Sequence, residues 1–444
     1  MTKEAFIQNV TEQIRCVRAR DGIARELSDH ITDQAAAYEE AGEAHEEAVD
    51  RAVQEMGDPV EVGVELDRIH RPQIDYKLLG MAFLFHIAGF FIIWLMGDFS
   101  NHPQYIGRQC VVLALSFGVM AGMYFLDYSF IARYAYGIGI FVTAALLISN
   151  LFTVREGRVS GIMFCYLYVP VFAGILYRQR NRGYRALIWA MGMQFVITCL
   201  AQIFSGTPAA ANIYLIGTAL LVIAVAKGWF SVNRKAAVAA LAGALMLLPL
   251  VLVTVKIAVF GNGYQAHRLL AWLNPERDAE GAGYVYRWLR QEWGMVRLIG
   301  AADNSPLLGD SLIGGPFFTE PFILLQLICK YGILAGAALV VAFAAVTVRA
   351  FQIAKRQKNQ LGFMLSVASF MVILLNCLEG ILINTGYFLV SSMQFPFVTY
   401  SACTAMTYAA LIGLLLSIYR NERIVTEETF RRPMRRITVK WEKR

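Results

Sequence analysis

The sequence predicts an all-α polytopic membrane protein with about ten transmembrane helices, a large outer loop between helices 7 and 8, and a small N-terminal cytosolic helical domain. Of the 444 residues, 57% are hydrophobic and only 16% are charged, which excludes a soluble protein of this length. Apolar runs of about 20 residues, the length that crosses a bilayer, recur from Leu78 to Tyr419.

Residues 1–70 are expected to form a separate acidic domain. They hold 7 Lys and Arg against 17 Asp and Glu, which leaves 33 against 16 for the rest of the chain. Apolar residues at helical spacing predict three or four helices, with Gly42 and Gly57 as stops and Asp58-Pro59 as a start. This stretch resembles the permease-prefix (HAAS-like) helical module of Gram-positive membrane proteins. The module implies either a signalling or docking role or a passive, solubilising one.

A linker at 71–77 leads into an expected transmembrane domain at 78–423. Backbone groups in lipid must be satisfied internally, so each apolar run is predicted to be a helix. The expected spans, in order, are 78–97, 109–126, 130–152, 160–177, 186–204, 209–226, 236–260, 321–348, 361–386 and 399–419.

Positive charges set the expected orientation. Alternate loops are rich in Lys and Arg, as is the tail at 424–444, so these loops and both termini are predicted to be cytoplasmic. The polar, acidic N-terminus is unlike a cleavable signal peptide. The basic tail is expected to bind anionic membrane lipids, and no nucleic-acid partner is expected.

Chemistry is expected in the outer loop at 261–320, because the signatures of soluble enzymes, such as a P-loop or HExxH, are absent. The loop mixes aromatic side chains with arginines, among them Arg268 and Arg287. Arginines on an outer membrane surface can clamp phosphates in forked geometry. The other interpretation is an amphipathic helix lying on the bilayer.

Two charges inside apolar spans form a second candidate site. Lys330 lies in the span at 321–348, and Glu379 lies at a similar depth in the span at 361–386. Charges in spans are costly and tend to pair or to line a cavity. We expect a Lys330–Glu379 interaction beside an outward-facing cavity, serving either structure or chemistry.

Several local strings resemble the SEDS family, the FtsW, RodA and SpoVE group. RLLAWLNPERDAEGAGY at 268–284 is similar to that family's loop string of an arginine, a proline-plus-acid turn and Gly-Tyr. NTG at 384–386, followed after nine residues by PFVTY at 396–400, matches the family's NxG and PFxSY strings. The resemblance covers residues 78–423 and implies ten helices with a large outer loop before helix 8.

The resemblance implies a reaction. SEDS proteins polymerise lipid II, the undecaprenyl-pyrophosphate disaccharide, outside the cytoplasmic membrane during division, elongation or sporulation, usually with a class B penicillin-binding protein. We therefore expect a protein of the cytoplasmic (inner) membrane, from a Gram-positive bacterium. The chemistry needs a base for the acceptor hydroxyl and cations for the leaving pyrophosphate. A divalent cation, Mg or Mn, is a possible cofactor, although no dedicated ligand cluster is visible.

The resemblance also assigns roles. The family's candidate base is an Asp just before helix 8, and Glu320 falls at that place with a slip of one residue. Glu320-Pro321 also fits an ordinary helix start, where the helix dipole stabilises an acid and proline is tolerated. The candidates for substrate binding are Arg268, Arg287, Lys330, Glu379, Asn384, Thr399 and Tyr400.

Departures from the family pattern keep other functions open. The family's Gln-Pro-Ser-Glu string in the fourth span is replaced by residues 169–172, and its nearby Lys by Ile175. An acid of helix 8 has become Lys330. The alternatives are therefore a catalytically degenerate SEDS-like scaffold or lipid-precursor-binding protein, regulated through its N-terminal domain, and a flippase-like protein.

Overall fold

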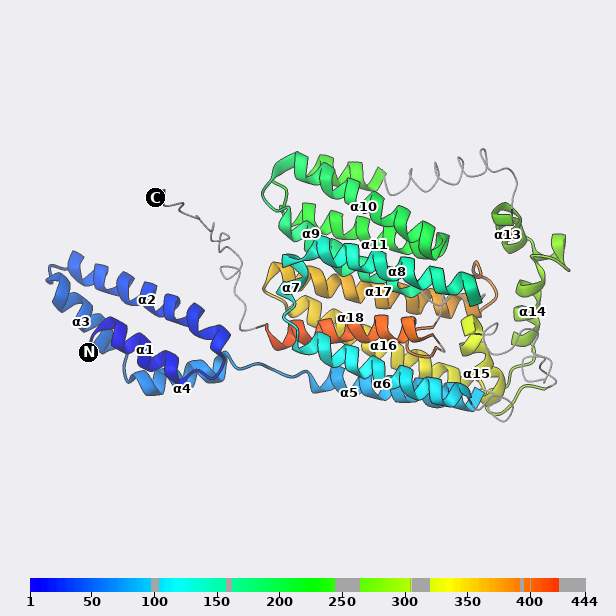
Figure 1. The fold of residues 1–444 in the computed structure, drawn as a ribbon, viewed down its shortest axis with the longest axis horizontal. Helices are drawn as coiled ribbons and strands as arrows, with labels where there is room; N and C mark the ends of the chain where they lie inside the picture. Colours follow the sequence, from blue (N-terminus) through cyan, green and yellow to red (C-terminus); the bar gives the residue numbers. More distant parts are fainter. Residues whose placement is uncertain are drawn as a thin grey trace, which may run out of the picture. The chain divides into compact units, whose positions relative to one another are not determined.

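The computed structural model describes residues 1–96, 104–156, 162–243, 264–303, 305, 320–391, 395–399 and 401–422 (Figure 1). The described part is helical and contains no strand, so the all-α prediction is confirmed. The chain divides into two compact units. The first comprises Met1–Asp75, Gln357–Gln360 and Tyr419–Arg444, and the second comprises Tyr76–Arg356 and Leu361–Ile418.

The first unit contains four N-terminal helices: α1 (Lys3–Gln13), α2 (Val17–Glu40), α3 (His45–Glu55) and α4 (Pro59–Ile69). They enclose a small apolar core that includes Phe6, Val10 and Ile31. Gly42 and Gly57 follow helix ends and adopt positive φ angles of 99° and 85°, which glycine allows at little cost. The side chain of Asp58 accepts a hydrogen bond from the Val60 amide at 2.9 Å, so α4 begins at the predicted place.

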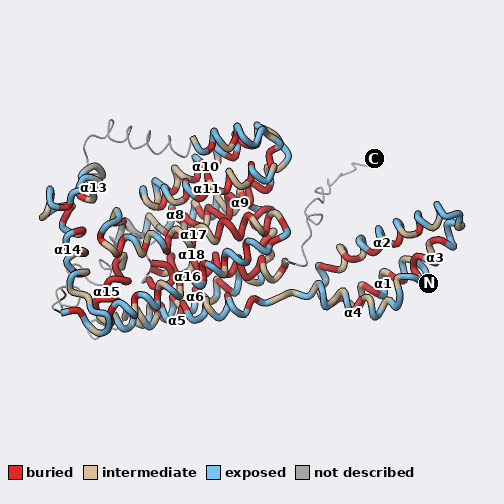
Figure 2. The backbone as a smooth tube through the Cα atoms, turned by 180° about the vertical axis from the view of Figure 1, so that it is seen from behind, coloured by how far each residue is buried: buried red, intermediate tan, exposed pale blue. Residues whose placement is uncertain are grey.

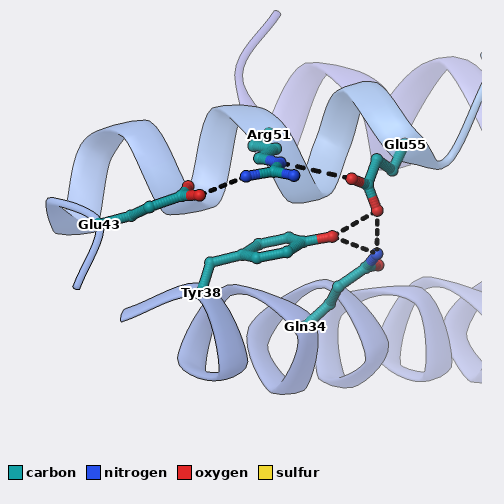
Figure 3. Close-up of polar contacts among 5 residues, drawn as sticks. All are labelled: Gln34, Tyr38, Glu43, Arg51 and Glu55. Atoms are coloured by element: carbon teal, nitrogen blue, oxygen red, sulfur yellow. Dashed lines mark hydrogen bonds and ion pairs between the residues drawn. The ribbon is translucent and has the colours of Figure 1, made fainter. Parts of the chain in front are cut away.

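A polar cluster joins α2 to α3 (Figure 3). The Tyr38 hydroxyl and the Gln34 amide, the latter at 2.8 Å, both donate to the Glu55 carboxylate. Arg51 pairs with Glu43 and, at 3.4 Å, with Glu55, while its guanidinium lies 4.6 Å from the centre of the Tyr38 ring. The hydrogen bond from Tyr38 lowers the pKa of Glu55.

The second unit holds the membrane helices. Seven described helices are long and apolar enough to cross a bilayer, and the predicted span at 236–260 lies mostly outside the described residues, so the count of ten stays a prediction. The seven are α5 (Tyr76–Met96), α6 (Gln104–Phe125), α10 (Gly183–Ser205), α11 (Thr207–Ala226), α16 (Ile333–Arg356), α17 (Gln360–Asn384) and α18 (Ala402–Arg420).

Shorter helices complete this unit. They are α7 (Ser129–Arg133), α8 (Ala135–Glu156), η1 (Ile162–Leu167), α9 (Tyr168–Arg178), α13 (Tyr264–Leu273), η2 (Pro275–Asp278), α14 (Tyr284–Trp293), η4 (Glu320–Phe322) and α15 (Ile323–Tyr331). Burial is concentrated in α9, α17 and α18 (Figure 2), and these helices form much of the interior. Figure 1 shows α13, α14 and α15 at one end of the unit.

The predicted span at 321–348 is divided at Gly332. This residue has a φ of +96°, and a Cβ atom placed on it would lie 2.6 Å from the Leu298 carbonyl oxygen. The break is bridged by a hydrogen bond from the Ile333 amide to the Arg297 carbonyl at 2.9 Å. Lys330 therefore lies in the last turn of the short helix α15, where the helix dipole favours a cation, and not deep within a long span.

Candidate functional site

Helix α14 is the centre of the candidate site. Tyr286, Leu289 and Glu292, spaced by three residues, form its buried face. The turn before it is tight, because a Cβ atom on Gly283 would lie 2.1 Å from the Pro275 carbonyl oxygen. The Gly-Tyr string noted in the sequence therefore has a steric reason in this fold.

Helices α13 and α14 bind the segment that follows α17. Five hydrogen bonds make this contact: Arg268 Nη2 to Val390 O, Trp272 Nε1 to Tyr387 O (2.9 Å), Val390 N to Tyr286 Oη (3.2 Å), Arg290 Nε to Gly386 O (3.3 Å) and Trp293 Nε1 to Asn384 O (2.8 Å). Because almost all of the acceptors are backbone carbonyls, side chains of α13 and α14 fix the path of residues 384–390.

Gly386 makes the close approach possible. It has a φ of +72°, and a Cβ atom there would lie 2.9 Å from the Leu289 Cβ atom. The glycine of the NTG string is thus required both by its backbone conformation and by its contact with α14.

Asn384 connects this segment to the start of α15. Its Nδ2 atom donates to the carbonyl oxygens of Pro321 (2.9 Å) and Gly380 (2.7 Å), and its Oδ1 atom accepts from the Leu325 amide (2.9 Å). All three partners are backbone groups, and the side chain is fully buried. Asn384 therefore holds the backbone next to Glu320, the predicted base.

The structure describes Glu320 as the first residue of η4, and its side chain lies outside the description. Tyr400 also lies outside the described residues. Thr399 is buried and its hydroxyl accepts from the Ser401 amide at 3.0 Å, so it shapes the turn before α18. The roles of these three residues remain predictions.

Arg287 lines a cavity of about 400 Å³ beside α14. The other lining residues are Glu276, Tyr284, Trp288, Arg290 and Gln291. Arg287 Nε lies 3.4 Å from Glu276 Oε1, and the Arg290 guanidinium lies 4.5 Å from the centre of the Tyr387 ring. Two guanidinium groups at one cavity suit an anionic ligand.

The predicted Lys330–Glu379 interaction is wrong. Lys330 Nζ donates to the Leu95 carbonyl at 2.5 Å. Glu379 accepts from Asn212 Nδ2 at 2.6 Å and from Ser391 Oγ at 2.9 Å. The two charges do not pair because each has another partner. The break after α15 leaves Lys330 beside the Leu95 carbonyl, and the side-chain amide of Asn212 in α11 binds Glu379.

Asn212 was not identified from the sequence. Its Nδ2 atom also contacts the hydroxyl of Tyr166 at 3.1 Å, which joins η1, α11 and α17 around Glu379. A single polar residue in an apolar run, here within residues 209–226, is the signal that could have revealed it.

A site for a divalent cation needs several donor side chains close together. The described residues contain no group of three or more His, Cys, Asp or Glu side chains able to hold a metal ion. These described residues therefore do not fit a dedicated metal site.

Comparisons with known proteins give a consistent result. The family model of the cell cycle proteins FtsW, RodA and SpoVE matches residues 75–424. A chain of a peptidoglycan synthase complex, studied for its coordination of polymerization and crosslinking, is 17% identical with a TM-score of 0.60, covering 79% of this chain and 98% of that chain. No curated protein sequence matches.

The rod shape determining protein RodA of Thermus thermophilus is also similar. It is 14% identical with a TM-score of 0.48, and 79% of this chain and 97% of that chain are covered. A point mutant of the same protein is 13% identical with a TM-score of 0.49, and 79% of this chain and 98% of that chain are covered. At 17% identity and a TM-score of 0.60, the similarity to the synthase chain shows a shared fold.

Proposed function

The chain belongs to the SEDS family of cell cycle proteins, the FtsW, RodA and SpoVE group, and from this premise we propose that it is a glycosyltransferase that polymerises lipid II. It is a multi-pass membrane protein, as its family and the seven apolar helices among the described residues indicate. The proposed product is a glycan strand outside the cytoplasmic membrane.

The observation that carries this proposal is that the Asn384 side chain binds the backbone of η4 and of the first turn of α15. Its two hydrogen bonds there, to Pro321 and Leu325, fix the backbone that carries Glu320. A general base must be placed within hydrogen-bond reach of the proton it removes, so a rigid anchor beside it is what the chemistry requires.

In the proposed reaction, the Glu320 carboxylate takes the proton of the acceptor sugar's 4-hydroxyl. The oxygen then attacks the anomeric carbon of the donor, and the bond to undecaprenyl pyrophosphate breaks with its electron pair on the leaving phosphate. Arg268 and Arg287 would stabilise the charge that develops there, because guanidinium groups bind phosphate oxygens in pairs. Lys330 in α15 and Glu379 in α17 would each adjust the charge of the substrate pocket.

The proposed partner is a class B penicillin-binding protein. The similarity to a chain of a peptidoglycan synthase complex supports this partner, since that chain is found in an assembly that polymerises and crosslinks. We propose that both termini face the cytoplasm, that the tail at 424–444, which lies outside the described residues, binds anionic lipid, and that the source is a Gram-positive bacterium.

The test is polymerisation of labelled lipid II by the purified protein, alone and with a class B partner. We expect glycan strands that lengthen when the partner is added. If neither condition yields strands under a range of Mg and Mn concentrations, the proposal is wrong.

One observation favours a second candidate, a degenerate scaffold. Residues 169–172, which stand where the family has Gln-Pro-Ser-Glu, are apolar and buried in α9. The charged groups expected at this place are therefore missing. If the scaffold hypothesis is correct, deleting residues 1–70 abolishes function in cells, while Glu320→Gln leaves it unchanged.

A further inference from the structure

Glu292 is a fully buried carboxylate that the proposed reaction does not use. Its Oε2 atom accepts from Ser305 Oγ at 2.5 Å and lies 3.7 Å from Cys329 Sγ. Its Oε1 atom has no hydrogen-bond partner, and within the described ranges no Lys or Arg pairs with it. Burying a carboxylate without a cation is costly, and an unsatisfied buried oxygen in a native fold requires an explanation.

The contacts of two adjacent residues in α14, Glu292 and Trp293, give the explanation. Glu292 binds Ser305, at the beginning of the connection that leads to η4. The next residue, Trp293, donates to the backbone oxygen of Asn384, whose side chain binds the carbonyl of Pro321 at the end of that connection. Two adjacent residues thus fix the two ends of one connection.

Glu292 also contacts α15 itself. Cys329 belongs to that helix, and its carbonyl accepts from the Ala302 amide at 2.7 Å. Nearby, the Gly300 amide donates to the Tyr331 carbonyl at 3.1 Å. The residues after α14 therefore run along the end of α15, and the buried carboxylate sits between the two.

We propose that Glu292 is a positioning residue for glycosyl transfer: it accepts hydrogen bonds from Ser305 and Cys329 and so fixes α15, the helix that directly follows η4 and Glu320. It acts through these groups and, being buried, does not touch substrate. The kinetic part of this proposal rests on the proposed function, and the structural part does not.

The kinetic test compares Glu292→Gln, which keeps an acceptor oxygen, with Glu292→Leu and Ser305→Ala. We expect Glu292→Leu and Ser305→Ala each to lower kcat about tenfold, with KM changed less than about threefold. The double variant that carries both substitutions should lose no more kcat than either single variant. Glu292→Gln should stay within about threefold of the wild type, as should the exposed control Glu280→Gln. A Gln variant as poor as Leu, or additive losses, would overturn the proposal.

A second readout is independent of activity. Hydrogen–deuterium exchange of residues 320–331 in the full-length protein should be faster in Glu292→Leu and in Ser305→Ala than in the wild type, and unchanged in Glu292→Gln and Glu280→Gln. If the wild type makes no glycan strands, the proposed function fails while this comparison still decides the positioning role. Unchanged exchange in both Glu292→Leu and Ser305→Ala overturns that role.

Discussion

The side-chain oxygen of Asn384 accepts a hydrogen bond from the backbone amide of Leu325 at 2.9 Å, across the first turn of α15. The same side chain donates to the Pro321 carbonyl. The end of α17 and the start of α15, distant in the sequence, are thus joined by one amide that satisfies donors and acceptors on both. Buried polar groups with every bond made fix a unique local geometry.

Asn384→Asp should reduce both stability and polymerisation. The carboxylate would face the carbonyls of Pro321 and Gly380 in place of a donor, which we expect to cost about 2 kcal/mol or more. The readouts are the unfolding midpoint in detergent and the rate of strand formation. Asn274→Asp, at an exposed position between α13 and η2, is the control. Equal effects of the two changes would contradict this account.

Gly332→Ala should destabilise the break between α15 and α16. The alanine would need a φ of +96° and would place its Cβ atom 2.6 Å from the Leu298 carbonyl oxygen. Gly332 combines this φ with a ψ of 168°, a backbone conformation essentially restricted to glycine, which costs an alanine about 1–3 kcal/mol, and the contact adds to this. Gly118→Ala, within α6 and with no neighbouring atom near its Cβ position, should leave the unfolding midpoint unchanged or raised.

The contact between Asn212 and Glu379 should appear as a coupling energy. Asn212→Leu removes the donor to a partly buried carboxylate, and we expect a loss of about 1–3 kcal/mol. Adding Glu379→Leu should restore part of this loss, because the carboxylate that has lost its Asn212 donor is then gone. Denaturant titration of the four proteins measures the coupling, and strictly additive losses would mean that the two residues act independently.

The acidic domain should lose stability at low pH through Glu55. Its pKa is lowered from 4.5 in the folded state, chiefly by the Tyr38 hydrogen bond. The contribution is therefore fully present above pH 4.5 and disappears as the pH falls through the lower, folded value. Hydrogen exchange of residues 34–55 should be faster in Tyr38→Phe than in wild type at pH 7, and the difference should shrink at low pH. A constant difference would assign the effect to packing.

Much of the fold follows from apolar run length. Helices α5, α10, α11 and α17 begin and end within a few residues of the predicted spans, since lipid leaves helix as the solution for such runs. The break at Gly332 was not predictable, because a glycine in a sequence can adopt either a helical or a positive φ angle. This break is also why Lys330 and Glu379 were wrongly paired.

The candidate site was predicted in part. Arg268 and Asn384 are predicted substrate residues, and the structure adds that each binds a backbone group; their role toward substrate stays a prediction. Glu292 was missed, although it continues the three-residue spacing of Tyr286 and Leu289 and so belongs to the buried face of α14. Periodicity could have found it, whereas its contact with Ser305 depends on a chain path that sequence does not reveal.

The most direct test of the central claim is strand formation from labelled lipid II by wild type, Glu320→Gln and the control Glu280→Gln, each with the same class B partner. The account predicts strands from wild type and Glu280→Gln, and a loss of about 100-fold or more in Glu320→Gln. Wild-type rates from Glu320→Gln would contradict it and place the base elsewhere.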